Sequence, residues 1–68
     1  MIMKALKIGR TMNGLPCVIF VTTFISRENE KLIKQWLEDT GITGAVVGVR
    51  NVRFTNEEDA MLCLMSFA

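Results

Sequence analysis

Three adjacent carboxylates, Glu57, Glu58 and Asp59, form the densest group of side chains in this sequence that could do chemistry. General acid–base catalysis needs a His, or two carboxylates held apart across a cleft. The chain has no His, and consecutive residues cannot face one another across a cleft. Negative charge in the first turn of a helix is stabilised by the helix dipole. We therefore expect these acids to begin a helix, and we expect no catalytic site among them.

The hydroxyl and thiol groups of the chain lack an activating base. A nucleophilic Ser, Thr or Cys needs a neighbouring base or a lowered pKa. Cys17 and Cys63 lie in apolar runs, where a free Cys behaves as a small hydrophobic residue, so we expect free thiols. Two Cys without a His also fall short of the usual zinc ligand sets. The sequence predicts a protein without catalytic centre, metal or cofactor; an enzyme stays an alternative only if one of these thiolates is reactive.

Basic residues in the first ten positions and at 50–53 offer a different kind of site. The net charge of +1 excludes an acidic DNA mimic and a strongly basic nucleic-acid binder. The basic residues could still line one edge of a sheet, as in a small RNA- or DNA-binding regulator. Proteins that bind single strands also use exposed aromatic residues, whereas the aromatic residues here lie in apolar segments. The residues of this alternative are Lys4, Lys7, Arg10, Arg50 and Arg53.

The first part of the chain has the pattern of a β-hairpin. Residues 3–12 and 15–24 are predicted strands, the second rich in β-branched and aromatic residues. Asn13-Gly14 between them favours a type I′ turn, in which both residues have positive φ. The nearly unbroken apolarity of residues 15–24 predicts a central strand that is covered on both faces.

The middle of the chain predicts a helix followed by a third strand. Ser26 is a good N-cap, apolar residues recur at helical spacing over 27–40, and Gly41 ends the helix. Residues 44–49 are apolar and β-branched, so strand, helix and strand form a βαβ unit. We expect its two strands to be parallel and its crossover right-handed. The polar Arg50 breaks the alternation and predicts a bulge or bend.

The last segment predicts a short second helix. Thr55 and Glu58 fit a capping box, with Thr55 as the N-cap, which gives a helix over 56–64. The apolar run 61–67 is also compatible with a strand. The predicted fold is a single α+β domain over residues 1–68, with a small single-layer sheet and a helix packed on one face. Its element order is ββαβα, or ββαββ in the alternative.

The apolar content of so short a chain indicates self-association. Half of the 68 residues are hydrophobic and the mean hydropathy is +0.32. A domain of this size buries only about 60% of the surface of its unfolded chain, and small domains are often stabilised by oligomerisation. We expect a two-fold dimer whose interface uses an exposed strand edge and the apolar C-terminal segment. The candidate interface residues are Met61, Leu64, Met65 and Phe67.

The longest apolar run does not predict a membrane segment. Basic residues followed by residues 15–25 imitate a signal peptide, but no small-residue cleavage site follows them. This run is well short of the roughly 20 residues that span a bilayer. We therefore expect a cytoplasmic protein that has no membrane partner.

The segment from Phe54 to Phe67 resembles the C-terminus of small accessory proteins of large tailed phages, of the kind that take over the host. Those proteins often end in an acidic patch, Asp-Ala, two apolar residues and a final aromatic residue, a pattern that residues 59–62 and Phe67 match. Cys63, Leu64 and Ser66 depart from it, and no functional residue is carried over. The resemblance implies a compact α+β protein that binds a host or phage macromolecule and alters its activity.

These observations lead to two functional hypotheses. The first is a non-enzymatic binding module, a phage accessory protein that binds and modulates or inhibits a host protein in the host cytoplasm, and that self-associates. The second is the nucleic-acid-binding regulator that uses the basic residues.

Overall fold

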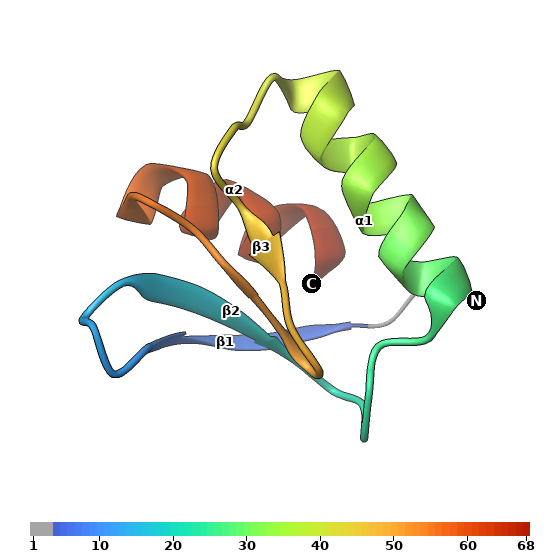
Figure 1. Ribbon diagram of the computed structural model, residues 1–68, viewed down its shortest axis with the longest axis horizontal. Coiled ribbons are helices and arrows are strands. Elements are labelled where there is room, and N and C mark those ends of the chain that lie inside the picture. Colours follow the sequence, from blue (N-terminus) through green and yellow to red (C-terminus); the bar gives the residue numbers. More distant parts are fainter. Residues whose placement is uncertain (1–3) are drawn as a thin grey trace.

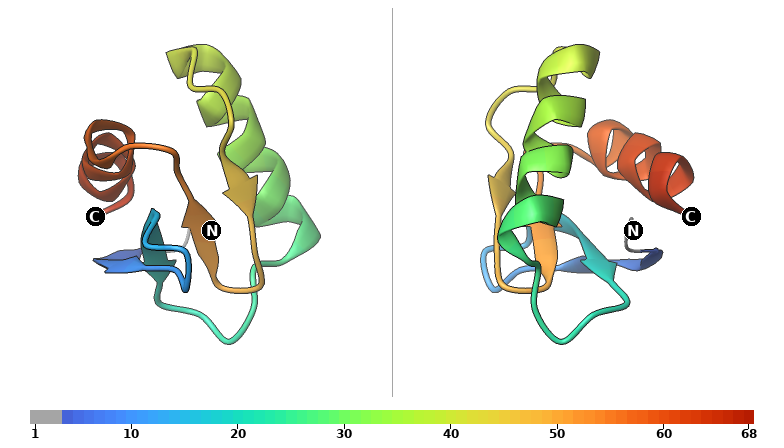
Figure 2. Two further views of the ribbon diagram at one scale, coloured as in Figure 1. Left: turned by 60° about the vertical axis from the view of Figure 1, so that its left-hand side comes forward. Right: turned by 90° about the vertical axis from the view of Figure 1, so that its right-hand side faces the viewer.

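The computed structural model describes residues 4–68, which form two layers, a four-stranded sheet and two helices that cover one of its faces (Figures 1 and 2). Met3, where the first predicted strand begins, lies outside the described residues. The elements are β1 (Ala5–Arg10), β2 (Pro16–Phe20), α1 (Arg27–Thr40), β3 (Val46–Val47), β4 (Asn51–Arg53) and α2 (Glu57–Phe67). The α+β class is confirmed, but both predicted element orders are wrong, because the order is ββαββα.

The sheet has the strand order β1-β2-β4-β3, and every neighbouring pair is antiparallel. The predicted βαβ unit placed β2 beside β3. Both strands do run in the same direction, since each is antiparallel to β4, but β4 lies between them. Val52 is the reason that β4 takes this position, because it pairs with Val18 at the centre of the sheet and both are fully buried. The strand escaped prediction because only three residues of it pair.

The turn that joins β3 to β4 replaces the bulge or bend predicted near Arg50. The Gly48 amide donates a hydrogen bond to the Asn51 carbonyl over 2.7 Å, so the chain reverses within these residues. A Cβ at Gly48 would collide with the Asn51 side chain. The break in the apolar alternation therefore marks a chain reversal.

The turn between β1 and β2 is longer than the predicted type I′ turn. Gly14 has a φ of 80°, but no non-glycine residue among 4–68 has a positive φ, so Asn13 does not. The Gly14 amide donates to the Thr11 carbonyl over 2.9 Å, and the Leu15 amide donates to Thr11 Oγ1 over 3.1 Å. This is the three-residue hairpin loop in which a glycine in the left-handed region follows a tight turn. The predicted turn type is wrong because the Thr11 hydroxyl offers a closing hydrogen bond.

Helix α1 has the predicted bounds. Ser26 Oγ accepts a hydrogen bond from the Asn29 amide over 3.2 Å, and Gly41 ends the helix with a φ of 74°. Its amphipathic stripe turns Ile33 and Leu37 into the core. Local capping and periodicity were sufficient to predict this helix.

Helix α2 begins one residue later than predicted and extends to Phe67. Asn56, not Thr55, is the N-cap, because Asn56 Oδ1 accepts the Asp59 amide over 2.9 Å. Asn56 Nδ2 also donates to Asp59 Oδ2 over 3.0 Å, so the predicted Thr55–Glu58 capping box does not form. The alternative of a C-terminal strand is wrong as well.

A single core joins the four elements that contribute to it. β2 is a central strand, as predicted, but the helices cover only one of its faces, so the prediction of two covered faces is wrong. Phe67 extends the core between the layers, because its ring makes edge-to-face contacts with Phe20 at 5.7 Å and with Trp36 at 5.5 Å between centroids. The buried core residues are Val18, Phe20, Ile33, Leu37, Val52, Phe54, Ala60 and Cys63.

The correction of the α2 N-cap can be tested directly. We expect Asn56→Ala to lower the free energy of unfolding by about 1 kcal/mol, because the Asp59 amide loses its acceptor. Thr55→Ala is the matched control and should change stability by less than about 0.5 kcal/mol, as an exposed residue without a capping role. Chemical denaturation of both variants measures this, and a larger loss for Thr55→Ala would contradict the assignment.

Candidate functional site

The acidic cluster lies in the first turn of α2, as expected. Glu57 forms an ion pair with Arg10, and Asp59 takes part in the Asn56 cap. Arg10 also donates to the Gly14 carbonyl over 3.0 Å, so it links the β1–β2 loop to the start of α2. Arg10, Glu57 and Asp59 therefore have structural partners. Within residues 4–68, no three Cys, Asp or Glu side chains gather as a metal site would require.

Both cysteines are free thiols with almost no exposed surface, and only Cys63 belongs to the core. Cys17 is 3% exposed and Cys63 is fully buried. Burial raises the pKa of the Cys63 thiol from 9.0 to about 12, because the apolar surroundings disfavour the thiolate. A reactive cysteine needs an exposed, electropositive environment. The surroundings of Cys63 are the opposite of those that activate a nucleophile.

The four predicted interface residues lie on two different sides of α2. Leu64 and Phe67 are half-buried and pack against the core, whereas Met61 and Met65 are 49% and 70% exposed. Leu62, which the sequence analysis did not select, is exposed beside them. The outer face of α2 is therefore defined as Met61, Leu62 and Met65. Helical spacing places these three residues on the side of the helix opposite Ala60 and Cys63. It does not say which of the two sides faces the sheet.

The five predicted basic residues are all exposed, but the structure does not bring them to one edge. Lys7 and Arg53 lie on the face of the sheet that the helices leave uncovered. Lys4 and Arg50 lie at one end of the sheet, where their carbonyls accept hydrogen bonds from Val21 and Phe20 over 2.9 Å. Arg10 lies at the opposite end, in its ion pair with the start of α2.

The uncovered face follows from the register of the strands. Val18, Phe20 and Val52 point into the core, so the alternate residues of each strand point away from it. A Cβ placed on Gly9 would meet Ile19 and Cys17, which confirms that these side chains share the outer side. We call this surface the open face of the sheet. Its residues are Lys7, Gly9, Cys17, Ile19, Val46, Asn51 and Arg53.

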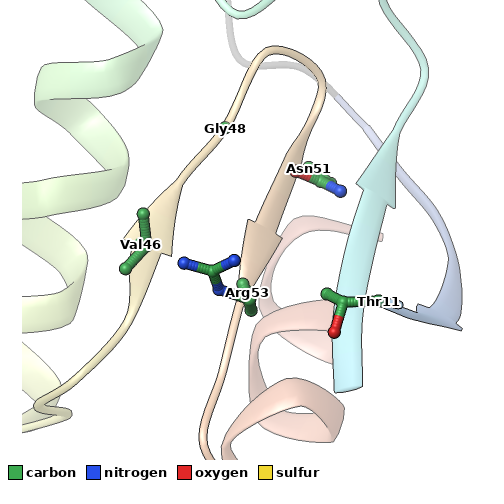
Figure 3. Close-up of a pocket in the computed structure, with 5 residues that line it drawn as sticks. All are labelled: Thr11, Val46, Gly48, Asn51 and Arg53. Carbon is green, nitrogen blue, oxygen red and sulfur yellow. The ribbon is translucent and has the colours of Figure 1, made fainter. Parts of the chain in front are cut away.

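A shallow depression of about 100 Å³ lies on the open face (Figure 3). Arg53 and Asn51 of β4 line it, with Thr11 on one side and Val46 on the other. Sites for small organic ligands usually measure about 300–1,000 Å³. This depression suits part of a larger partner and not a whole small molecule.

Phe24 is an exposed aromatic residue, although it belongs to an apolar segment of the sequence. It lies in the loop after β2 and is 63% exposed. The next residue, Ile25, donates its amide to the Val49 carbonyl, which holds the loop beside the β3–β4 turn. The exposure of Phe24 was not predicted because β2 ends early, at Phe20. The apolar residues that follow do not belong to the sheet.

Comparison with known proteins gives no relative from which a function could be inferred. No family model, no curated protein and no solved structure matches this chain. None of the helices in residues 4–68 has the length and apolarity needed to cross a membrane.

The burial of the thiols predicts their reactivity. We expect neither Cys63 nor Cys17 to react with iodoacetamide at pH 8 in the folded protein. A pKa of about 12 leaves about one Cys63 in ten thousand as thiolate, and Cys17 is shielded by its burial. Both should react once the protein is unfolded in denaturant, as mass spectrometry can measure. Rapid labelling of either thiol in the native state would contradict this arrangement and would support the enzyme hypothesis.

The raised pKa of Cys63 also predicts a loss of stability at high pH. The folded protein favours the neutral thiol, so this stabilisation is complete below pH 9 and is lost as the pH rises toward about 12. Unfolding measured for the parent and for Cys63→Ala should show the gap between them shrinking above pH 9, by at most about 1.4 kcal/mol per pH unit. A gap that stays constant to pH 10.5 would contradict the assignment.

Proposed function

We propose that this protein is a non-enzymatic binding module that docks onto another protein and self-associates through the outer face of α2. The observation that carries the proposal is the exposure of Met61, Leu62 and Met65 on a helix whose opposite side is fully engaged in the core. Methionine side chains are flexible and adapt to a partner surface. A helix that is apolar on its outer side as well gains from covering that side.

The strand edge nearest to this surface is β1. It is one of the two edges of the sheet, and α2 packs over β1 and β2. Residues 7–10 pair regularly with β2, while a bulge at Leu6 leaves that side chain 57% exposed. The other edge, β3, has two residues and offers little backbone to a partner. A partner strand added to β1 would therefore lie beside the outer face of α2.

The chemistry of the side chains supports a binding role and not a catalytic one. The chain has no His, and the thiols are buried. The acids at the start of α2 serve the helix and the Arg10 ion pair. The imidazole that most often serves as general base is thus absent, and the thiols are shielded from a substrate.

The resemblance of the C-terminal segment to phage accessory proteins suggests the kind of partner. A host protein that is bound and modulated, or inhibited, suits a small module without catalytic groups. A second copy of the chain suits the same surface, because a two-fold contact places the same apolar patch on both sides.

Substitution of the outer face of α2 tests the proposal. We expect the parent chain to sediment at about twice its 7.7 kDa at micromolar concentration, and Met65→Glu to sediment as a monomer with unchanged folding. Met12→Glu is a matched control, because Met12 is fully exposed in the β1–β2 loop and is not part of the outer face of α2. A parent chain that stays monomeric, or equal effects of the two variants, would contradict self-association through this face.

The host-protein part of the proposal needs its own measurement. We expect the tagged parent chain and Met12→Glu to retain one host protein that Met65→Glu does not retain, as identified by mass spectrometry. Retention of the same proteins by all three chains would contradict docking through α2.

A further inference from the structure

The charges of this protein separate between its two layers. All seven carboxylates of the chain lie within the two helices, as the positions of the Asp and Glu residues show. Helix α1 carries three basic residues and four acids, and α2 carries three acids and no basic residue. Five of the eight basic residues therefore belong to the strands and turns. The net charge of the chain is near zero, but the sheet layer is cationic and the helical layer is acidic.

The open face is the part of this cationic layer that a partner can reach. Lys7 and Arg53 point away from the helices, and neither takes part in the two ion pairs formed within residues 4–68. Thr11 and Asn51 add polar groups at the depression beside Arg53. The strands contribute no carboxylate to this face. Nothing within the described fold neutralises its charge.

We infer that the open face binds the phosphate backbone of a single-stranded nucleic acid. The register places Lys7 opposite Ile19 and Arg53 opposite Cys17, two strands apart, so their Cα atoms lie roughly 12 Å from each other. Long cationic side chains at this separation can contact different phosphates of one strand. Lys4 and Arg50 continue the positive charge at the end of the sheet where β2 stops.

Phe24 favours a single strand over a duplex. Its ring is 63% exposed in the loop that is hydrogen-bonded to the β3–β4 turn, next to Arg50. A base of a flexible strand can stack on such a ring, whereas the bases of a duplex are already stacked. The other aromatic residues lie in or against the core. This surface is separate from the outer face of α2, so the inference stands independently of the proposed function.

Fluorescence anisotropy with labelled oligothymidylate and oligouridylate tests the inference on the full chain. Single-strand binding should weaken with salt, with a slope of about −2.8 in log affinity against log salt if four cations contact phosphates. The double variant Lys7→Gln/Arg53→Gln should bind at least about 10-fold more weakly at low salt and reduce the slope by about 1.4. Lys31→Gln/Lys34→Gln on α1 is the matched control and should bind like the parent.

Phe24→Ala separates stacking from charge. It should weaken single-strand binding about 10-fold with an unchanged salt slope, and leave duplex binding unaffected. Circular dichroism of each variant verifies folding, and Met65→Glu should bind the oligonucleotides like the parent. The inference is overturned by absent binding at low salt, by equal losses in the two lysine-containing double variants, or by tighter binding to phosphatidylserine vesicles than to either oligonucleotide.

Discussion

One apolar sheet face, two strands wide, supports the whole protein. Val18 and Val52 face each other at its centre with no exposed surface, and Phe20 and Phe54 extend it at 1% exposure each. Both helices pack their apolar stripes on this face. Each such side chain contributes about 1.5–3 kcal/mol through burial, which is large for a domain of this size. Because the core is shared, neither helix has a packing surface independent of the other.

The aromatic contacts of Phe67 show how this constraint couples the helices. Its ring lies edge-to-face against Phe20 of β2 and Trp36 of α1, so the end of α2 contacts both the sheet and the other helix. Phe67, which the apolar C-terminal segment suggests as an interface residue, therefore packs inside the protein. The apolar surface left to a partner is the opposite side of α2.

Covering one face of the sheet also decides the distribution of charge. The acids lie in the helices, where negative charge favours the helix starts, and therefore on the helical side of the protein. The basic residues of β1 and β4 lie on the other side of the sheet or at the ends of the sheet. A protein with a net charge of +1 thereby acquires surfaces of opposite character. Neither surface is apparent from composition, because composition averages over both layers.

Local signals in the sequence determined helix α1 completely: Ser26, an amphipathic stripe and Gly41 act within a few residues of one another. They also determined that the acids of residues 57–59 begin a helix, although the N-cap was misplaced by one residue. Only the tertiary structure decided that β4 separates β2 from β3, because a three-residue strand is stabilised by its neighbours and not by its own propensity. The same holds for the surfaces. Which side of α2 and which side of the sheet face outward depends on the packing of the two layers.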